Sequence, residues 1–573
     1  MPIRLLSPEV ARRIAAGEVV ERPASVVKEL VENSLDSGAT RVAVEVVEGG
    51  VRLLRVTDNG SGIAAEELEL AFRRHATSKL PEDDDLQAIS TLGFRGEALP
   101  SIAAVSEVEA VSRPSGSAAG ALIRLESGEV VDIRPAGAPV GTSISVRNLF
   151  RRQPARLKFL RSASAEGGQI ATVVSHYALA YPEVAFSLTL DARETFATTG
   201  GGSRREAVAG AYGAGTAAAM IDVSEASDGH HLEALVGGPG LSRASRTYIT
   251  VFINRRWVRS RSLTYAVEEA YRGLLQTGRF PIAVVDLRIP PHEVDVNVHP
   301  AKAEVRLRDE RRVFALVQRP IRAALAGMAA PEYGAAPAWP RAFMTPPVGS
   351  AGVGLGQAEA PAPNADRQAR QEPLPARIPV LRPLGQAGTT YLIAEGPAGL
   401  YLIDQHAAHE RVLFERIRSL NAAPPAAVQG LLSPVALELT PAQEALLASM
   451  ASPLSQVGFE VERFGPGGRG HSGGGYLLRA VPPLMKAEDP ARAFAEFLDL
   501  LTREDGPGDP LDRVAASMAC HAAVRAGHTM SLEEMRDLLR QLEECELPQT
   551  CPHGRPTMLH LSADELARRF ARR

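Results

Sequence analysis

The first 215 residues show two different hydrophobic periods. From Ser25 to Asp36 the apolar side chains recur at helical spacing, which predicts an amphipathic helix. Residues 41–47 (RVAVEVV) and 51–56 (VRLLRV) carry the shorter alternation of half-buried strands. This mixture of helices and strands predicts an α+β domain over residues 1–215.

The next stretch, residues 216–330, has a strand–helix–strand order. Residues 247–253 and 280–289 are strand-like, and residues 262–274 between them have a helical period. Because the two strands are separated by a helix, we expect a crossover connection. The pattern therefore predicts a second, smaller α/β domain.

Residues 331–378 contain nine prolines and five glycines and show little apolar periodicity. A segment of this composition cannot bury a core, so we expect a disordered linker. After it, residues 379–573 form a further domain, in which an apolar strand (399–404) leads into a helix (407–417). The whole chain is predicted to be an α+β multidomain protein.

Composition limits the possible classes of protein. A chain of 573 residues is too long for one core, so two to four domains are expected. The formal net charge is −4, so any nucleic-acid contact must come from a local basic patch. No apolar run reaches the roughly 18 residues of a membrane span, and no signal-peptide core is present. Three cysteines argue against a disulfide framework and favour a reducing, cytoplasmic location.

The basic residues are strongly skewed toward arginine. Lysine occurs at only five positions, and the other 58 of the 63 basic residues are arginine. A position that keeps lysine is therefore a candidate for needing a compact point charge. Two of the five, Lys79 and Lys302, lie inside motifs described below.

The chain has no P-loop of the GxxxxGK[S/T] type, but the N-terminal helix carries a possible alternative nucleotide site. Glu29 and Asn33 are four residues apart and are therefore neighbours on the helix, with Asp36 behind them. Glu29 is suited to orient and deprotonate a water, and Asn33 is suited to hold Mg²⁺ beside it. In isolation, such a pair is more often a solvated helix face.

Three further elements follow within the first 145 residues. Asp58, in 58-DNGSG-62, comes after a strand and can accept a hydrogen bond from an adenine amino group. The glycines behind it allow the backbone to approach a ligand closely. Residues 91–99 (TLGFRGEAL) form a glycine-bearing loop whose backbone N–H groups suit phosphates, and Gly141 and Thr142 open a strand.

A second candidate site lies in the C-terminal block, in 404-DQHAAHE-410. His406 and Glu410 share a helix face, and Asp404 at the strand end can converge on the same point. Soft ligands follow in SMACH and CPHGRP, at Cys520, Cys551 and His553; the last two are spaced to face one side of an extended segment. Carboxylate, imidazole and thiolate together suit zinc, or zinc paired with a harder catalytic metal. The alternative is a surface helix with incidental acids.

Two surface motifs indicate macromolecular partners. Four arginines within seven residues can neutralise DNA phosphates without distinguishing bases: Arg255, Arg256, Arg259 and Arg261, with Arg151, Arg152 and Arg156 as further candidates. A solvated arginine face is the alternative. The segment 429–434 fits the QxLLxP pattern of peptides that dock on the replicative sliding clamp, through Gln429, Leu431, Leu432 and Pro434. An ordinary loop-to-strand entry is the alternative there.

In combination these motifs resemble a known family. The four nucleotide elements, in this order, resemble the N box and glycine boxes of the GHKL ATPases, shared by gyrase, a heat-shock chaperone family and histidine kinases. The segments 93–99 (GFRGEAL), 148–159 (NLFRRQPARLKF) and 294–306 (VDVNVHPAKAEVR) narrow the resemblance to the MutL mismatch-repair family. DQHAAHE, the ACH segment and CPHGRP look like the motifs of its nicking-endonuclease branch.

The resemblance implies a fold and a set of site residues. It implies a GHKL (Bergerat) ATPase sandwich, a transducer domain of ribosomal-S5-like type, the linker, and a C-terminal dimerisation and endonuclease domain. Glu29, Asp404 and Glu410 would be catalytic. The residues implied for ATP and Mg²⁺ are Asn33, Asp36, Asp58, Gly62, Thr77, Ser78, Lys79, Gly93, Phe94, Arg95, Gly96, Glu97, Ala98, Leu99, Thr142 and Lys302, the last reaching the γ-phosphate from the second domain. Those implied for Zn²⁺ and for Mn²⁺ or Mg²⁺ are Asp404, His406, Glu410, Cys520, Cys551 and His553. One departure is His521, where many relatives have lysine or arginine.

The implied function is an ATP-gated homodimer that nicks DNA during mismatch repair. Its expected partners are DNA, held weakly and in a salt-dependent way, the mismatch-recognition protein MutS and the sliding clamp. The main alternative is a non-nucleolytic ATP-driven clamp or matchmaker whose zinc is structural. The carboxylates of Asp404 and Glu410 argue against that alternative, since a structural zinc site does not need them. A topoisomerase or sensor kinase is disfavoured because no phospho-acceptor helix or membrane sensor is present.

Overall fold

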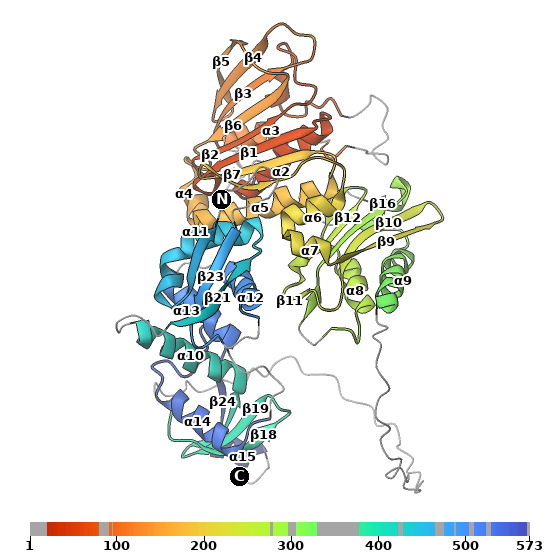
Figure 1. Ribbon diagram of the computed structural model, residues 1–573. Coiled ribbons are helices and arrows are strands. Elements are labelled where there is room, and N and C mark those ends of the chain that lie inside the picture. The colour runs from red at the N-terminus through yellow and green to blue at the C-terminus, as the bar shows by residue number, and fades with distance from the viewer. Residues whose placement is uncertain are drawn as a thin grey trace. The chain divides into compact units, whose positions relative to one another are not determined.

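The computed structural model describes residues 20–79, 91–93, 96–275, 279–295, 305–328, 378–421, 428–464, 475–485, 489–503, 509–522 and 529–569. The chain divides into two compact units, the first formed by residues 1–325 with 416–522, the second by residues 326–415 with 523–573. Sheets and helices occur in both units, which confirms the predicted mixed α/β, multidomain class (Figure 1). The predicted linker, except Ile378, lies outside the described residues.

An eight-stranded sheet with the order β5-β4-β3-β6-β2-β1-β7-β8 opens the first unit. Strand β1 alternates buried and half-exposed residues, because its valines at 42, 44 and 46 face the helical layer and the residues between them face outward. The strands are β1 (Arg41–Val47), β2 (Leu53–Asp58), β3 (Glu107–Arg113), β4 (Gly120–Glu126), β5 (Glu129–Ala136), β6 (Gly141–Arg147), β7 (Ala185–Leu190) and β8 (Arg193–Ala197).

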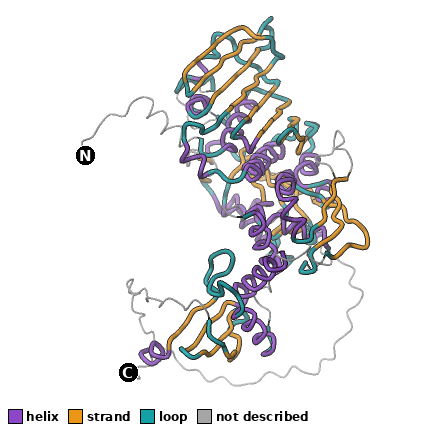
Figure 2. The backbone as a smooth tube through the Cα atoms, turned by 90° about the vertical axis from the view of Figure 1, so that its left-hand side faces the viewer, coloured by secondary structure: helices purple, strands orange, loops and turns teal. Residues whose placement is uncertain are grey.

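Helices cover one side of this sheet, as Figure 2 shows. The largest is α5 (Ala163–Ala180), which is capped by the Ser162 hydroxyl and packs with α2 into the same core. The helices of this part are α2 (Pro23–Asp36), α3 (Ala98–Ala104), α4 (Pro154–Phe159), α5, α6 (Arg204–Tyr212) and α7 (Ala214–Ala218). The predicted boundary at residue 215 falls inside α7.

A five-stranded sheet with the order β13-β12-β15-β10-β9 follows. Strands β12 and β15 pair in parallel, with Val251 opposite Val285, and α8 lies between them in the chain, so the predicted crossover connection is confirmed. The elements are β9 (Met220–Ser227), β10 (His230–Gly237), β11 (Ser242–Arg243), β12 (Ile249–Ile253), β13 (Arg256–Val258), α8 (Arg261–Ala270), β14 (Phe280–Pro281), β15 (Ala283–Arg288), β16 (Val294–Asp295), β17 (Arg306–Leu307) and α9 (Glu310–Met328).

The rest of the first unit comes from the C-terminal block and contacts the N-terminal domain. Helix α11 lies against α5, and Arg193 of β8 pairs with the buried Glu444 and bonds to Tyr476. The elements are β21 (Gln429–Leu437), α11 (Pro441–Gln456), β22 (Glu460–Phe464), β23 (Gly475–Val481), α12 (Pro490–Arg503) and α13 (Pro510–Ala522). The predicted domain 379–573 therefore contributes to both units.

The buried carboxyl of Glu444 makes this contact sensitive to pH. Burial raises the pKa of Glu444 to about 7, although Arg193 lies 3.3 Å away. The pKa of Glu444 is higher in the folded protein than the unfolded value of 4.5, so protonation of this carboxyl favours the folded state. Its contribution to the free energy of unfolding is complete below pH 4.5 and is lost as the pH rises through 7. We expect Glu444→Gln to be more stable than wild type at pH 8, by about 3 kcal/mol, and equal to it near pH 4.5.

Thermal unfolding at the two pH values measures this difference. Glu462→Gln, at an exposed carboxylate of β22, is the matched control and should show no pH-dependent gain. A stability difference for Glu444→Gln that is the same at both pH values would contradict the assignment.

The second unit contains a four-stranded antiparallel sheet with the order β18-β19-β20-β24. Its core joins Leu392, Tyr401 and Ile403 of the sheet to leucines 538, 539 and 542 of α14. The elements are β18 (Arg382–Ala387), β19 (Tyr391–Gly396), β20 (Gly399–Asp404), α10 (Gln405–Asn421), α14 (Leu532–Glu543), β24 (Met558–Ser562) and α15 (Ala563–Arg569). Among the described residues of both units, no helix is long and apolar enough to cross a membrane.

Candidate functional site

Helix α2 carries the first group of predicted nucleotide residues. Pro23 occupies its first turn, and the buried Val27, Leu30 and Val31 fix which face packs on the sheet. On the opposite, half-buried side, Glu29 and Asn33 lie one turn apart. The helix thus presents a carboxylate and an amide together on one side, as the spacing predicts.

Asp58, at the end of β2, is fixed by three hydrogen bonds. Its Oδ2 accepts from the Ser34 hydroxyl at 2.8 Å, and its Oδ1 accepts from the backbone N–H groups of Gly60 (2.9 Å) and Thr142 (3.2 Å). Ser34 is the neighbour of Asn33 on α2, so the helix and β2 are joined at this carboxylate. These bonds fix the orientation of the Asp58 carboxylate, for which the sequence predicts an adenine contact.

Two glycines next to Asp58 are required by geometry. Gly62 has φ +74°, and a Cβ there would lie 2.4 Å from the carbonyl oxygen of Arg113. Gly141 has φ +118°, and its Cβ would lie 2.1 Å from the carbonyl oxygen of Asp58. A side chain at Gly141 would push β6 away from Asp58, and one at Gly62 would push the turn after Asp58 away from the end of β3.

Asp36 organises the other end of α2. Its carboxylate accepts the backbone N–H groups of Leu92 at 2.9 Å and Gly93 at 3.0 Å. The Lys79 ammonium lies 2.5 Å from Asp36 Oδ2 and 2.8 Å from Asn33 Oδ1. Oxygen ligands that surround the Lys79 ammonium in this way also suit Mg²⁺, because ammonium and Mg²⁺ both prefer hard oxygen ligands. The residues at this point therefore fit the implied metal ion.

Lys28 is a neighbour of this group that the motifs did not single out. Its ammonium lies 3.1 Å from Glu29 Oε1 and 3.0 Å from Glu32 Oε1. Burial alone would lower the pKa of Lys28, but the two carboxylates outweigh burial and raise it. Lys28 therefore stays charged and holds the Glu29 carboxylate. The sequence pointed to Lys28 only in that it is one of five lysines in a chain whose other basic residues are arginine.

The remaining predicted nucleotide residues differ in placement. Thr77 Oγ1 accepts the Lys79 N–H at 3.2 Å, Gly96 accepts the His75 N–H at 3.2 Å, and Glu97 lies 3.9 Å from His75. Ala98 and Leu99 begin α3, and Ser78 is exposed. Phe94, Arg95 and Lys302 lie outside the described residues.

The predicted metal ligands of the second unit begin at the junction of β20 and α10. Asp404 Oδ1 accepts the backbone N–H groups of His406 at 2.9 Å and Ala407 at 3.0 Å, so this carboxylate caps the helix. One turn on, Glu410 is buried, and its Oε1 lies 3.1 Å from His406 Nε2. Strand 399–404 and the helix after it form as their hydrophobic periods predict.

Cys551 and His553 approach Glu410 from a turn. His553 Nδ1 lies 3.3 Å from Glu410 Oε2 and 3.9 Å from Cys551 Sγ, and ligand atoms of the three residues are all within 4.8 Å of one another. Burial alone would raise the pKa of Glu410, but hydrogen bonds from the two histidines outweigh it and hold that pKa well below its usual range. Thiolate, imidazole and carboxylate at this spacing fit zinc.

One geometric expectation for these residues was wrong. The segment is not extended, because Cys551 N–H donates to the Arg555 carbonyl at 2.8 Å and Gly554 N–H donates to the Cys551 carbonyl at 2.9 Å. Gly554, with φ +78°, permits the reversal. The two ligands meet because of this tight turn and not because of a strand period.

Four further residues of the C-terminal block have the following contacts and positions. Glu415, the last acid of the first metal motif, accepts the backbone N–H groups of Glu546 and Leu547, so it ties α10 to the segment after α14. Cys545 is half-buried and packs against the core of the second unit, and burial raises the pKa of its thiol to about 12. Cys520 and His521 lie on α13 of the first unit, and Cys520 is half-buried there.

The four-arginine run does not form one uniform face. Arg259 and Arg261 are exposed, with Arg259 stacked over the Trp257 ring, while Arg255 pairs with Glu183. Arg256 is 8% exposed and donates to backbone carbonyls, so it is not presented to a DNA backbone. Its inclusion in the DNA surface was therefore wrong. The alternating period of β13 offered that distinction, since Arg256 and Val258 face one way and Trp257 the other.

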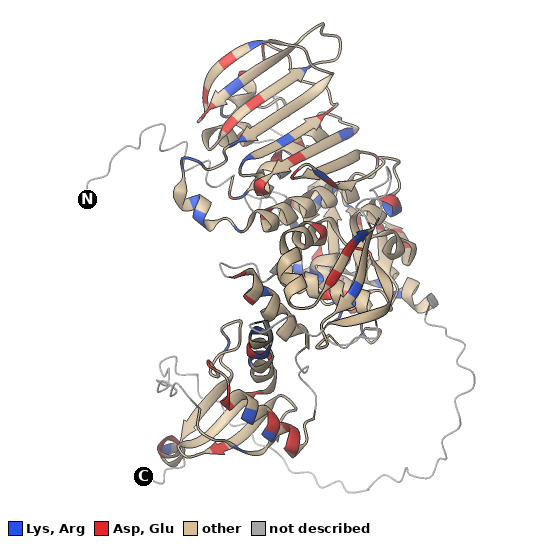
Figure 3. Ribbon diagram, turned by 60° about the vertical axis from the view of Figure 1, so that its left-hand side comes forward, with Lys and Arg blue, Asp and Glu red and all other residues tan. Residues whose placement is uncertain are grey.

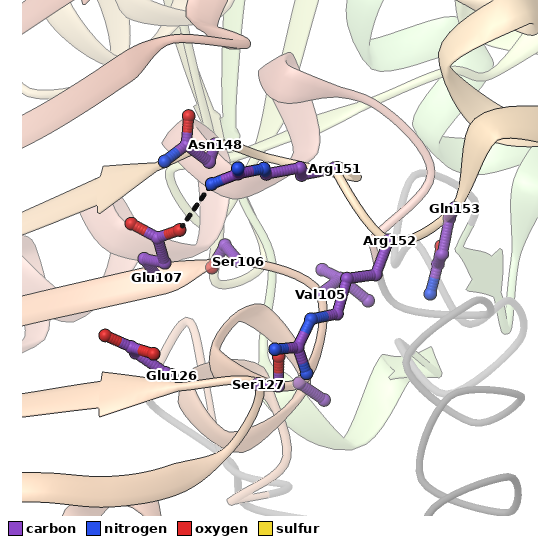
Figure 4. A pocket seen from close by; sticks show the side chains of 10 residues that line it. Val105, Ser106, Glu107, Glu126, Ser127, Asn148, Arg151, Arg152 and Gln153 are labelled. Atoms are coloured by element: carbon purple, nitrogen blue, oxygen red, sulfur yellow. Dashed lines mark ion pairs between the residues drawn. The ribbon is translucent and has the colours of Figure 1, made fainter.

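Arg151 and Arg152 line a separate pocket of about 330 Å³ at the edge of the first sheet, with Glu107 and Glu126 on its opposite side (Figure 4). Arg151 lies 3.5 Å from Glu107. The carboxylates oppose a phosphate, so the pocket itself is poorly suited to a DNA backbone. Figure 3 likewise shows acidic and basic residues interspersed along the strands of this sheet.

The predicted clamp motif lies at the start of β21, an edge strand. Gln429 pairs opposite Val481, and the register then shifts between Gly430 and Val435. The residues between them bulge from the sheet, and the Leu432 side chain is fully exposed. An apolar side chain held out on an edge bulge is available to a partner.

Comparisons with known proteins cover the whole chain. Residues 21–129 match the family model of histidine kinase-, DNA gyrase B- and HSP90-like ATPases, residues 208–326 that of the DNA mismatch repair protein, C-terminal domain, and residues 384–530 that of the MutL C terminal dimerisation domain. The chain is 41% identical to the DNA mismatch repair protein MutL of Symbiobacterium thermophilum, with both sequences covered to 100%. It is 42% identical to that of Desulforudis audaxviator, covering 100% of this chain and 99% of the relative. The Aquifex aeolicus MutL ATPase domain complexed with ADP is 32% identical and covers 48% of this chain and 94% of that one, with a TM-score of 0.37.

Proposed function

The chain belongs to the MutL family of DNA mismatch repair proteins, and from that premise we propose that it nicks one DNA strand at a metal site in its C-terminal block. Its N-terminal domain is a GHKL-type ATPase that binds ATP. The match to a dimerisation domain supports a homodimer. In this proposal the ATPase cycle controls when the nicking site acts on DNA during repair.

The observation that carries the proposal is the convergence of Glu410, Cys551 and His553. These residues come from a helix and a distant turn, and Glu410 is buried, so an incidental surface cluster does not account for them. Cys551 and His553 would hold Zn²⁺, which shapes the pocket. Asp404 and Glu410 supply oxygen ligands suited to Mn²⁺ or Mg²⁺.

Bound divalent metal would supply an activated water and stabilise the leaving oxygen of the broken phosphodiester. The chain's own residues hold this arrangement in place. Asp404 is oriented by two backbone N–H groups, and Glu410 is oriented by His406 and His553. Because these contacts fix the orientation of both carboxylates, the site is preorganised for an ion.

The test is nicking of supercoiled plasmid with Mn²⁺, together with the zinc content of the purified protein. Cys551→Ser is expected to lose bound zinc and nicking together, with some loss of stability. Cys545→Ser is the matched control, because that thiol packs against the core of the second unit and is not one of the grouped ligands, and this variant should keep its zinc. A Cys551→Ser protein with full zinc content and wild-type nicking would overturn the proposal.

The alternative is a matchmaker that clamps DNA, recruits other factors and uses zinc only as a structural element. It predicts a protein that binds zinc and hydrolyses ATP but leaves plasmid intact under all metal conditions. The buried Glu410 between two histidines favours the nicking proposal, since structural zinc sites are built mostly from cysteine and histidine.

The DNA contact is proposed to be weak and non-specific. Arg259 and Arg261 are exposed, and Arg255 can leave its surface ion pair with Glu183, so these three can neutralise backbone phosphates. We include the mismatch-recognition protein MutS as a partner, and a cytoplasmic location, on the strength of the family alone. Salt titration of DNA binding checks the electrostatic character of the contact.

The bulge at the start of β21 is proposed to bind the replicative sliding clamp. Leu431 and Leu432 would enter an apolar pocket on the clamp, while Gln429 and Pro434 set the orientation. We expect Leu432→Ala to weaken clamp binding about 10-fold or more, the typical cost of removing a buried anchor. ATP hydrolysis should not change, because Leu432 makes no part of the nucleotide site. Equal clamp affinity for the variant and wild type in a pull-down or titration would exclude this motif.

A further inference from the structure

The guanidinium of Arg256 reaches from the second domain into the nucleotide site of the first. Arg256 opens β13, whose partner β12 belongs to the five-stranded sheet. Its Nη2 donates to the carbonyl oxygens of Thr91 and Leu92, each at 3.2 Å. These two carbonyls lie at the start of the glycine-bearing loop that the sequence assigns to phosphates.

The same short segment is held from its other side by Asp36. The Asp36 carboxylate accepts hydrogen bonds from the N–H groups of Leu92 and Gly93. Residues 91–93 are therefore hydrogen-bonded through their carbonyls to Arg256 and through their N–H groups to Asp36. Leu92 is itself buried in the ATPase core. Two oppositely charged side chains from different domains therefore fix this segment.

These contacts extend to Lys79 and Asn33, beside the residues that fit a metal ion. The Asp36 oxygen that accepts the Gly93 N–H also lies 2.5 Å from the Lys79 ammonium, which is 2.8 Å from Asn33. A shift of residues 91–93 would therefore move the carboxylate and disturb the contacts of Asn33. Arg256 thus acts on the cation site through the backbone of a neighbouring segment.

The strand that carries Arg256 is firmly anchored on the ATPase side. Trp257, the next residue, packs on the ATPase core, and its ring lies 4.6 Å from the ring of His176 of α5 in a tilted arrangement. A displacement of β13 would therefore be passed on to the guanidinium, and so to the Thr91 and Leu92 carbonyls. A movement of the second domain would in this way change the backbone position at the nucleotide site.

Packing alone gives no reason for an arginine here. Arg256 Nη1 is buried and has no hydrogen-bond partner among the residues that the structure describes. A buried donor without an acceptor destabilises a protein relative to an apolar side chain of similar size. The residue is therefore kept for its directed hydrogen bonds and not for stability.

We propose that Arg256 is a positioning residue for ATP hydrolysis, which couples the orientation of the second domain to the backbone of residues 91–93. It does not touch the adenine side of the site at Asp58. The expected defect on its removal is thus a slower hydrolytic step with nucleotide affinity nearly unchanged.

The test is a comparison of Arg256→Gln with the wild-type full chain. We expect kcat for ATP hydrolysis to fall about 10- to 100-fold, the scale of a small misplacement in an active site. The Kd for ADP should stay within about threefold, since ground-state binding is retained. Backbone amides of Leu92 and Gly93 should lose hydrogen-exchange protection, a readout that a structural role elsewhere would not move.

Two further variants make the outcome decisive. Arg288→Gln, at an exposed arginine of the same sheet, is the control and should match wild type in kcat and exchange. Arg256→Lys keeps the charge but not the forked geometry, so kcat should be intermediate, and it carries the test alone if the glutamine variant does not fold. A wild-type kcat in both Arg256→Lys and Arg256→Gln would overturn the proposal. So would a loss of kcat that only parallels a fall in thermal stability, with no faster hydrogen exchange at residues 92–93.

Discussion

Glu29→Gln is expected to slow ATP hydrolysis by about 10²–10⁴-fold while ATP still binds. Glu29 is the only carboxylate on α2 that lies one turn from Asn33 on its N-terminal side, and it is the residue predicted to take a proton from water. Glutamine keeps the size of the side chain and removes its basicity. Steady-state hydrolysis and equilibrium ATP binding, measured on the same preparation, separate the two effects.

The matched comparison is Asn33→Ala on the same helix. It removes the oxygen that now contacts Lys79 and that would contact Mg²⁺, so Mg²⁺-dependent nucleotide binding should be lost as well as hydrolysis. If Glu29→Gln hydrolyses ATP at the wild-type rate, Glu29 has no part in the chemistry.

Asp404→Asn should abolish Mn²⁺-dependent nicking of plasmid and leave folding, dimerisation and ATP hydrolysis intact. Asparagine is as good a helix cap as aspartate, so it can keep the bonds from the His406 and Ala407 N–H groups while it removes the negative charge. The substitution therefore isolates metal binding from the capping role. Plasmid nicking is the measurement.

Asp404→Ala provides the comparison. It removes the cap as well as the charge, and we expect it to lower stability by about 1 kcal/mol relative to Asp404→Asn. A folded Asp404→Asn protein that nicks at the wild-type rate would remove this carboxylate from the proposed site. Loss of folding in the asparagine variant would instead favour the structural-zinc alternative.

Local patterns predicted the elements that carry the sites. Strand 41–47 and strand 399–404 have the predicted bounds, and the helix predicted over 25–36 begins two residues earlier, at Pro23. These segments follow from hydrophobic period and capping, which act over a few residues. The strand predicted over 51–56 is displaced to 53–58, because the short helical turn at Glu48–Gly50 occupies the connection.

Contacts between distant segments were not predictable in the same way. Nothing in the arginine run distinguishes Arg256 by composition, and its role appears only when Thr91, far away in sequence, lies beside it. The turn that joins Cys551 to His553 depends on backbone bonds to Arg555 that a two-residue spacing does not encode. Side-chain direction and tertiary partners decide such cases, and one sequence does not specify them locally.

The two lysines on and beside α2 have a consequence for how the chain tolerates substitution. In a protein where 58 of 63 basic residues are arginine, Lys28 and Lys79 each keep a rounded ammonium between two oxygen-bearing side chains. A flat, forked guanidinium fills such a space differently, and a Cβ at Gly93 would already lie 3.3 Å from the Lys79 nitrogen. At the exposed Lys158, exchange for arginine would be a mild change. At Lys28 and Lys79, the same exchange would be among the more disruptive substitutions.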